Sequence, residues 1–439
     1  MKGGIRAGSA AALVAANMIG AGVFTTSGFA LADLGGREPV LLAWAVGGVI
    51  ALFGALSYAA LAERIPGNGG EYLFLSRSLH PLVGFLAGWV SLFAGFTAPI
   101  AVSAHGFEAY LGDSFGLELP AGVLGATAIV VCGLIHGIRR EVGLRVQDSA
   151  VAAKILAMVA FIVIGGGILL TGGGGERETL EAGGLPTAAS GPSLSAFAVT
   201  LVWISFAYSG WNAAVYVAGE LEQSERTMRR AVVWATLGVT LLYLGLNAVF
   251  LWGAPVASLA GKAEVGAVAA EAIGGPGLRA ALSGLVAFAL ATSISAMVMV
   301  GPRVYAQMAA DGLFPARLVP GDEVPRGAIA LQVGLALVAF FVAELRELMS
   351  YVGFLLGLST AATVGCLFLP DPAGADTSRA APGMPWIPGL FIVATLGSSI
   401  FMLLREPAQA GAGLLTLLVG VVVYRVERRL RANASPDSA

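Results

Sequence analysis

The chain has 439 residues, of which 57% are hydrophobic and 12% are charged, and its net charge is −2. The charged share is about half that of a soluble globular protein, which excludes a soluble enzyme, a nucleic-acid-binding protein and a disordered scaffold. Long, uninterrupted apolar runs favour helices in a lipid bilayer over a membrane barrel, whose strands would alternate apolar and polar residues. The sequence therefore predicts an all-α integral membrane protein.

Twelve apolar runs are long enough to be predicted as membrane spans. The first of them is too long for the apolar part of a removable signal peptide. The predicted spans are 8–32, 39–63, 81–110, 121–138, 147–171, 194–219, 229–253, 279–306, 326–344, 347–369, 386–405 and 409–427.

The distribution of basic residues supports this count. With twelve spans, 18 Lys and Arg residues fall on the side of the two termini and 6 fall on the opposite side. Basic residues concentrate on the cytoplasmic side of membrane proteins. We therefore expect a multi-pass protein of the cell (plasma) membrane with both termini in the cytoplasm.

The first span contains a small-residue stretch, Met18-Ile19-Gly20-Ala21-Gly22-Val23-Phe24. Glycines in mid-span weaken a helix and allow its backbone to unwind and offer N–H and C=O groups to a ligand. Close packing against a neighbouring helix is the alternative explanation.

The sixth span contains a second such stretch, Trp203-Ile204-Ser205-Phe206-Ala207-Tyr208-Ser209-Gly210-Trp211-Asn212. Spans 1–5 and 6–10 then form two halves that each open with an interrupted helix, and an odd number of spans per half makes the repeats inverted. This pattern is typical of transporters with a binding site at the bilayer midplane. Helix N-terminal ends suit a carboxylate and C-terminal carbonyls suit an ammonium group, so the predicted substrate is an α-amino acid. An aromatic-rich packing helix is the alternative.

Span 5 contains Lys154, the one Lys or Arg near the middle of a predicted span. Intramembrane cations are usually functional, although a long side chain can also reach the interface. We expect this ammonium to take the place of a sodium ion and to bind carbonyls and hydroxyls of spans 1 and 8, with Thr292, Ser293 and Ser295 as the candidates on span 8. Proton coupling through Lys154 is a second interpretation. The sequence has no metal-ligand cluster and no nucleotide-binding loop, so we expect no cofactor.

Four stretches in chain order resemble the amino acid–polyamine–organocation family of secondary transporters, and more closely its L-amino-acid transporter branch in a prokaryotic form. They are Gly20-Ala21-Gly22-Val23-Phe24; Gly137-Ile138-Arg139 with Val146-Gln147 and Ala153-Lys154; Phe206 to Asn212 with Gly219-Glu220-Leu221; and Arg303-Val304-Tyr305 with Asp311-Gly312-Leu313-Phe314-Pro315. The first departs from the family pattern because Ala21 replaces a serine.

The resemblance implies a LeuT-type fold of five plus five inverted spans with two extra helices, in which helices 1 and 6 are discontinuous. A single transmembrane domain is then expected over 1–427, with repeats at 8–171 and 194–369, extra helices at 386–427 and a cytoplasmic tail at 428–439.

The resemblance also implies a substrate-binding set: Met18, Ile19, Gly20, Ala21, Gly22, Val23, Phe206, Ser209, Trp211 and Asn212. Backbone N–H groups of Ala21, Gly22 and Val23 are expected to bind the substrate carboxylate. Carbonyls of Met18, Phe206 and Ser209 are expected to take the amino group. Phe206 is further expected to gate the site, while Trp211 and Asn212 shape the side-chain pocket. Lys154 and Ser293 complete the set as sodium-replacing or proton-coupling residues.

The expected function is sodium-independent transport of L-amino acids, most simply as an exchanger. No Asp or Glu lies within one helical turn of either break, which favours neutral substrates. Asn212 slightly favours a polar or small side chain such as that of Ala, Ser or Cys, and a large one such as that of Leu or Phe is the alternative. Proton-coupled symport, a cationic amino acid or polyamine antiporter of the same fold, and an amino-acid-binding membrane sensor are the alternatives. Animal members pair with a glycoprotein through a cysteine between spans 3 and 4. The corresponding loop 111–120 has none, so we expect no covalent heavy-chain partner.

Overall fold

The computed structural model describes residues 7–67, 70–116, 119–138, 144–171, 193–213, 215, 225–310, 314, 324–370 and 383–434. These residues form helices and their connections, with no strand among them. The first half contains α1 (Ala7–Met18), α2 (Gly22–Leu34), α3 (Arg37–Arg64), α4 (Gly70–Ser78), α5 (Pro81–Val90), α6 (Ala98–Phe115), α7 (Val123–Ile138) and α8 (Leu144–Thr171). The second half contains α10 (Leu194–Tyr208), α11 (Glu225–Gly253), α12 (Val256–Leu259), α13 (Val265–Ala310), α14 (Arg326–Val342), α15 (Leu345–Gly365), α16 (Trp386–Arg405) and α17 (Pro407–Ala434).

The helices confirm a multi-span membrane protein. Among the described residues, eight helices are long and apolar enough to cross a membrane, and the bent pair α1–α2 makes up to nine. Three shorter apolar helices, α7, α10 and α14, coincide with the predicted spans 4, 6 and 9. The count of twelve spans therefore stays a prediction. Helix α10 is short because the chain leaves helical geometry directly after Tyr208.

Two helices extend beyond the predicted spans. Helix α13 begins at Val265 rather than near residue 279, and it is kinked at Gly274 and Gly275, where φ of Gly275 is +72° and Pro276 follows. Helix α17 continues past residue 427 to Ala434, because the Arg- and Ala-rich segment there favours helix. The predicted loop 172–192 and residues 435–439 lie outside the described residues.

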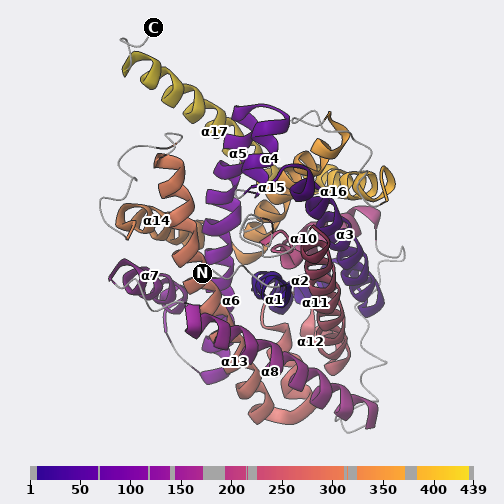
Figure 1. Cartoon of the computed structure of the whole chain (residues 1–439). Coiled ribbons are helices and arrows are strands. Elements are labelled where there is room, and N and C mark those ends of the chain that lie inside the picture. Colours follow the sequence, from indigo (N-terminus) through magenta and orange to yellow (C-terminus); the bar gives the residue numbers. More distant parts are fainter. Residues whose placement is uncertain are drawn as a thin grey trace.

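The broken pair α1–α2 lies in the middle of the bundle, and α17 projects from it at the C-terminal end (Figure 1). Helix α2 packs against α3, α10, α11 and α13. The buried core around it contains several large aromatic side chains, among them Trp44, Trp203, Tyr208 and Tyr243. Because these rings fill the space between the helices, the two interrupted segments are held in a tightly packed centre.

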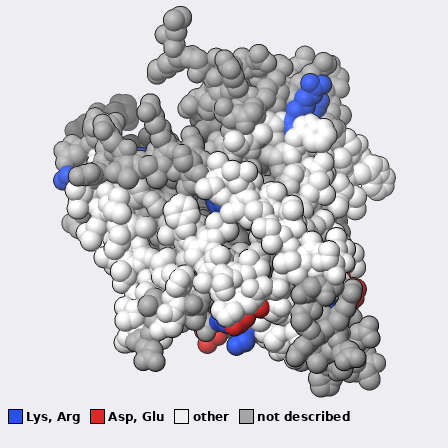
Figure 2. Space-filling view, turned by 90° about the horizontal axis from the view of Figure 1, so that it is seen from below, with Lys and Arg blue, Asp and Glu red and all other residues white. Residues whose placement is uncertain are grey.

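The surface is poor in charge. Figure 2 shows one face on which most described residues are neither acidic nor basic, and the charged ones form a few small groups. Large apolar side chains are exposed on peripheral helices, for example Leu170 on α8, Val393 on α16 and Leu404 also on α16. Such faces are expected where a helix meets lipid rather than water.

Candidate functional site

The first interruption lies between α1 and α2. Helix α1 ends at Met18 and α2 begins at Gly22, and the two are bent by 45°. The break predicted from the Gly-Ala-Gly stretch is therefore confirmed. Met18, Ile19 and Ala21 are buried, whereas a Cβ atom placed on Gly20 meets nothing within 4 Å. Open space thus lies beside the backbone of Gly20, next to the first turn of α2, where the N–H groups have no intrahelical acceptor.

The second interruption ends α10. Ser209 leaves helical geometry with ψ 148°, and Gly210 has φ +108°, a left-handed conformation that side chains rarely adopt. The chain then turns, with the N–H of Ala213 donating to the Gly210 carbonyl over 3.0 Å. Helix α10 thus ends within the stretch predicted to interrupt span 6. Residues 216–224, which contain the rest of that predicted span, lie outside the described residues.

The two interruptions touch each other. A Cβ atom on Gly22 would lie 2.6 Å from the Cα atom of Ala207, and one on Gly210 would lie 2.6 Å from the carbonyl carbon of Asn17. Because both contacts are with backbone or Cβ atoms, no side-chain rotation could relieve them. The glycines of the two motifs therefore allow α1–α2 and α10 to cross at backbone contact, which brings both broken segments into one site.

Lys154 of α8 reaches this crossing. Its Nζ atom donates to the carbonyl of Ile19 over 2.7 Å and lies 3.4 Å from that of Ala16. The Lys154 side chain is buried, with 4% exposed. The hydroxyl of Ser293, the expected partner on α13, instead donates to the Ala289 carbonyl of its own helix over 3.0 Å. The ammonium group is thus tied to the end of α1.

The other expected span-8 hydroxyls also have partners elsewhere. Thr292 donates to the carbonyl of Ala289 over 2.8 Å, and Ser295 bonds the ring of His136 over 2.8 Å. The two carbonyls that accept from Lys154, those of Ala16 and Ile19, both lie on the α1 side of the first break.

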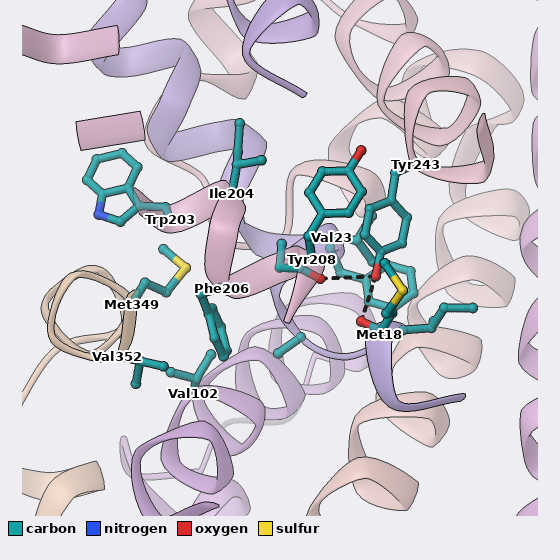
Figure 3. Packing of buried hydrophobic residues seen from close by; sticks show 14 of the residues in the cluster. Met18, Val23, Val102, Trp203, Ile204, Phe206, Tyr208, Tyr243, Met349 and Val352 are labelled. Carbon is teal, nitrogen blue, oxygen red and sulfur yellow. Dashed lines mark hydrogen bonds between the residues drawn. The ribbon is translucent and has the colours of Figure 1, made fainter. Parts of the chain in front are cut away.

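Tyr243 of α11 is a site residue that the sequence analysis missed. Its hydroxyl lies 2.7 Å from the Met18 carbonyl and 3.2 Å from the Ala207 carbonyl, and so joins the ends of both broken helices (Figure 3). A phenolic hydroxyl has one proton to donate, so the two carbonyls share it. Met18 was predicted to accept from the substrate amine, and that carbonyl already has a donor here. The polar pair Tyr243 and Asn247, one turn apart in an apolar span, was the available signal.

Tyr243 belongs to a buried polar network that links four helices. Asn247 donates to the Tyr243 carbonyl over 2.9 Å and accepts from Ser27 of α2. The Trp44 indole of α3 donates to Ser27 over 2.8 Å, and the Tyr208 hydroxyl of α10 donates to the Trp44 carbonyl over 3.1 Å. Satisfied networks of this kind rigidify their surroundings. Helices α2, α3, α10 and α11 are therefore held together on one side of the crossing.

Phe206 lies on the other side of the crossing. Its ring is buried and is surrounded by Val102 of α6 and by Met349 and Val352 of α15 (Figure 3). The remaining members of the predicted set, Trp211 and Asn212, follow the turn after α10. The Trp211 ring packs edge-on against that of Tyr58, with centroids 4.7 Å apart. The Asn212 amide donates to the carboxyl of Glu71 over 3.1 Å.

Span 3 carries an irregularity that the sequence analysis also missed. Between α5 and α6, residues Ser91–Thr97 form a π-helical segment. Segments of this kind appear frequently at functional sites because they widen the helix and redirect its side chains. Thr97 at its end is buried, and its hydroxyl has no hydrogen-bond partner among the residues that the structure describes.

A multi-span helical protein with two interrupted helices that cross at its centre has the architecture of a secondary transporter. The sequence profile described as "Amino acid permease" matches residues 7–423, and the chain belongs to this family. The resemblance to the amino acid–polyamine–organocation family is therefore confirmed, and the protein is a transporter rather than an enzyme.

Curated relatives agree with this family. The chain is 26% identical over 425 residues to the large neutral amino acids transporter small subunit 2 of Mus musculus, which covers 95% of this chain and 79% of the relative. It is 26% identical over 434 residues to the serine/threonine exchanger SteT of Bacillus subtilis (strain 168), covering 96% of each. It is 25% identical over 424 residues to the Asc-type amino acid transporter 1 of Homo sapiens, covering 95% of this chain and 80% of the relative.

A solved structure shares the fold. It is the crystal structure of the Eremococcus coleocola manganese transporter in complex with an aromatic bis-isothiourea substituted compound. The TM-score is 0.58 at 14% sequence identity, and the alignment covers 97% of this chain and 92% of the other. At this identity the likeness shows the fold alone.

Proposed function

We propose that the protein is a sodium-independent exchanger of neutral L-amino acids with small side chains. The observation that carries the proposal is the crossing of the two interrupted helices, with a fixed ammonium group, Lys154, 2.7 Å from the Ile19 carbonyl. That ammonium supplies at the first break the positive charge that a bound sodium ion would otherwise supply. The relatives named as a neutral amino acid transporter and as a serine/threonine exchanger support this substrate class.

The substrate is held by backbone groups of both breaks. The N-terminal end of α2, at Ala21, Gly22 and Val23, faces the open space beside Gly20 and binds the carboxylate. Carbonyls at the ends of α1 and α10 take the ammonium group. The Tyr243 hydroxyl already donates to two carbonyls at these helix ends. The substrate ammonium therefore either replaces Tyr243 as the donor or binds the remaining lone pairs of these carbonyl oxygens. Phe206 closes the site, and alternating access moves the half-helices around it.

The membrane arrangement follows from the same reasoning. We propose twelve spans in two inverted repeats, the nine candidates together with α7, α10 and α14, and both termini on the cytoplasmic side of the plasma membrane. We also propose that the transporter acts without a covalent partner, because the loop 111–120 has no cysteine and Cys132 and Cys366 are buried.

The test is uptake of labelled L-alanine, L-serine, L-leucine and L-arginine by the purified protein in liposomes, in sodium-free buffer. Each is measured with and without unlabelled substrate inside, and with or without a pH gradient. We expect uptake of the neutral amino acids only into preloaded vesicles. Uptake into empty vesicles driven by a proton gradient would overturn exchange in favour of symport. Ligand-induced thermal stabilisation without any uptake would overturn transport and indicate a sensor.

The variant Gly20→Ala tests where the substrate binds. Its added methyl group meets nothing within 4 Å in the substrate-free protein, so the thermal midpoint is expected to stay unchanged. If the substrate carboxylate occupies the space beside Gly20, KM for L-alanine rises. An unchanged KM would remove Gly20 from the proposed site.

A further inference from the structure

A cavity lies beside the broken end of α10, on the side of α3, α15 and α16. Its empty volume is about 570 Å³ when the mouth and the open space in front of it are included. Side chains and backbone from the α10 break form one wall, at Ser205, Phe206 and Ser209. Among the described residues that line it, none belongs to α1, α2 or α8. The cavity therefore adjoins the crossing at which the amino acid is proposed to bind. The two share the α10 break, because Phe206, Ser209, Trp211 and Asn212 of the predicted substrate-binding set also line the cavity.

The charged group of the cavity is the Glu71 carboxyl, which α4 contributes. Its side chain is buried, with 5% of Glu71 exposed. The Tyr58 hydroxyl and the Asn212 amide donate to Oε1 over 2.8 and 3.1 Å, and the Ser359 hydroxyl donates to Oε2 over 3.2 Å. These donors come from α3, the turn after α10, and α15, so three other parts of the fold fix the position of the carboxyl.

This carboxyl lacks a counter-charge. Within the part of the chain that the structure describes, Glu71 takes part in no ion pair, and its three donors are all neutral. Arg64, also on α3, donates instead to the carbonyls of Cys366, Leu367 and Leu369. A buried carboxylate without a cation is costly and either takes up a proton or pairs with a positive ligand.

The walls of the cavity suit an organic cation. Four aromatic residues are among those that line it, Phe206, Tyr208, Trp211 and Phe391, and the Trp211 and Phe391 rings meet edge-on with centroids 6.1 Å apart. Aromatic faces attract ammonium groups, and apolar walls accommodate the hydrocarbon part of an amine. Hydroxyls of Thr360 and Thr395 provide further hydrogen-bonding groups.

We propose that this cavity is a binding site for an organic ammonium ion, in which the Glu71 carboxylate is the counter-charge and the aromatic rings hold the apolar body. The cation is either a free small amine or the cationic side chain of an amino acid that enters past the α10 break. Both share the same recognition chemistry, and the experiment separates them.

Protons compete with the amine for the same carboxyl. Burial raises the pKa of Glu71, which lies outside the membrane-spanning helices, and the hydrogen bonds from Tyr58, Ser359 and Asn212 lower it in part. Of the groups on α3, α15 and the turn after α10 that bond this carboxyl, only the Tyr58 hydroxyl is titratable. Amine binding should therefore strengthen as pH rises and should release a proton from Glu71.

The experiment measures binding of benzylamine to the purified full-length protein by thermal shift and calorimetry, with benzyl alcohol as the neutral analogue. We expect saturable stabilisation by benzylamine and none by benzyl alcohol. Glu71→Gln keeps the size of the side chain but removes its charge, and is expected to weaken benzylamine binding by about tenfold to a hundredfold. Glu38→Gln, an exposed change at the far end of α3, is the matched control and should bind as the unchanged protein does.

Thr360→Leu is the second variant, should Glu71→Gln fail to fold, because it fills the cavity and leaves Glu71 in place. Benzylamine binding that survives Glu71→Gln or Thr360→Leu, or that benzyl alcohol reproduces, would overturn the proposal. Glu71-dependent uptake of labelled L-lysine would identify the amino acid side chain as the cation. Glu71-dependent benzylamine binding without L-lysine uptake would identify a separate amine site. Because binding is measured without transport, this proposal and the exchange proposal can fail independently.

Discussion

Gly22→Ala tests the contact between the two interrupted helices. The added Cβ atom would lie 2.6 Å from both Cα and Cβ of Ala207, which is about 1 Å closer than an ordinary carbon–carbon contact. Helix α10 has little freedom to retreat, because Gly210 already rests on the Asn17 backbone. Overpacking of this kind costs about 1–3 kcal/mol. Alanine stabilises a helix by about 0.5–1 kcal/mol relative to glycine, which is less than most of this overpacking cost. The net effect of Gly22→Ala on the free energy of unfolding is therefore destabilising.

The assay is the thermal midpoint of the purified variant together with L-alanine exchange in liposomes. We expect a lower midpoint and slower exchange, because the half-helices can no longer meet at backbone contact. Gly238→Ala on α11 is the matched control, since its Cβ atom meets nothing within 4 Å, and its midpoint should be unchanged or slightly higher. A Gly22→Ala protein with the midpoint and exchange rate of the unchanged chain would refute the reasoning, since the crossing would then have room for a methyl group.

Three further predictions concern the polar groups around the breaks. Lys154→Met leaves the buried carbonyl of Ile19 without its donor, which costs about 1–3 kcal/mol of stability. We expect this variant to show no exchange in liposomes. Exchange at the normal rate would contradict a role for the ammonium. Tyr243→Phe removes the donor that the Met18 and Ala207 carbonyls share, so the thermal midpoint should fall and KM for L-alanine should change. If only the thermal midpoint changes, the role of Tyr243 is structural. The raised pKa of Glu71 means that the native protein holds this proton more tightly than the unfolded chain does. Stability should therefore fall as pH rises through that pKa, and Glu71→Gln should abolish this fall while Glu38→Gln retains it.

The interruptions could be predicted because their cause is local. Glycine in mid-span lowers helix stability wherever the helix packs, so the Gly-Ala-Gly of span 1 and the Ser209-Gly210 pair of span 6 are visible in the sequence itself. Lys154 was visible for a similar reason, since a cation in an apolar run must find a polar partner. Its partner hydroxyls could not be identified in the same way, because Ser293 has an acceptor one turn away in its own helix.

Tyr243 and Glu71 could not be predicted because their roles arise only when distant helices pack. Tyr243 is one of nine tyrosines. Asn247, one turn away, marks a polar face on this apolar span, but the sequence does not show that the Tyr243 hydroxyl meets the ends of both broken helices. Glu71 is 141 residues from Asn212 along the chain and lies in a short helix between two predicted spans. Counting acidic residues within one turn of each break therefore overlooked a carboxyl that the fold brings to the second break.

This carboxyl changes the argument about substrate charge. The absence of Asp and Glu next to the breaks favoured neutral substrates on the ground that a buried cation needs a partner. With Glu71 in contact with Asn212, such a partner exists, and it lies in the cavity beside the α10 break. A neutral amino acid held by backbone groups at the crossing leaves Glu71 unpaired, whereas a cationic side chain that extends into the cavity would pair with it. The Glu71→Gln variant therefore separates the two substrate classes: neutral exchange should persist in it, and any transport of a cationic amino acid should not.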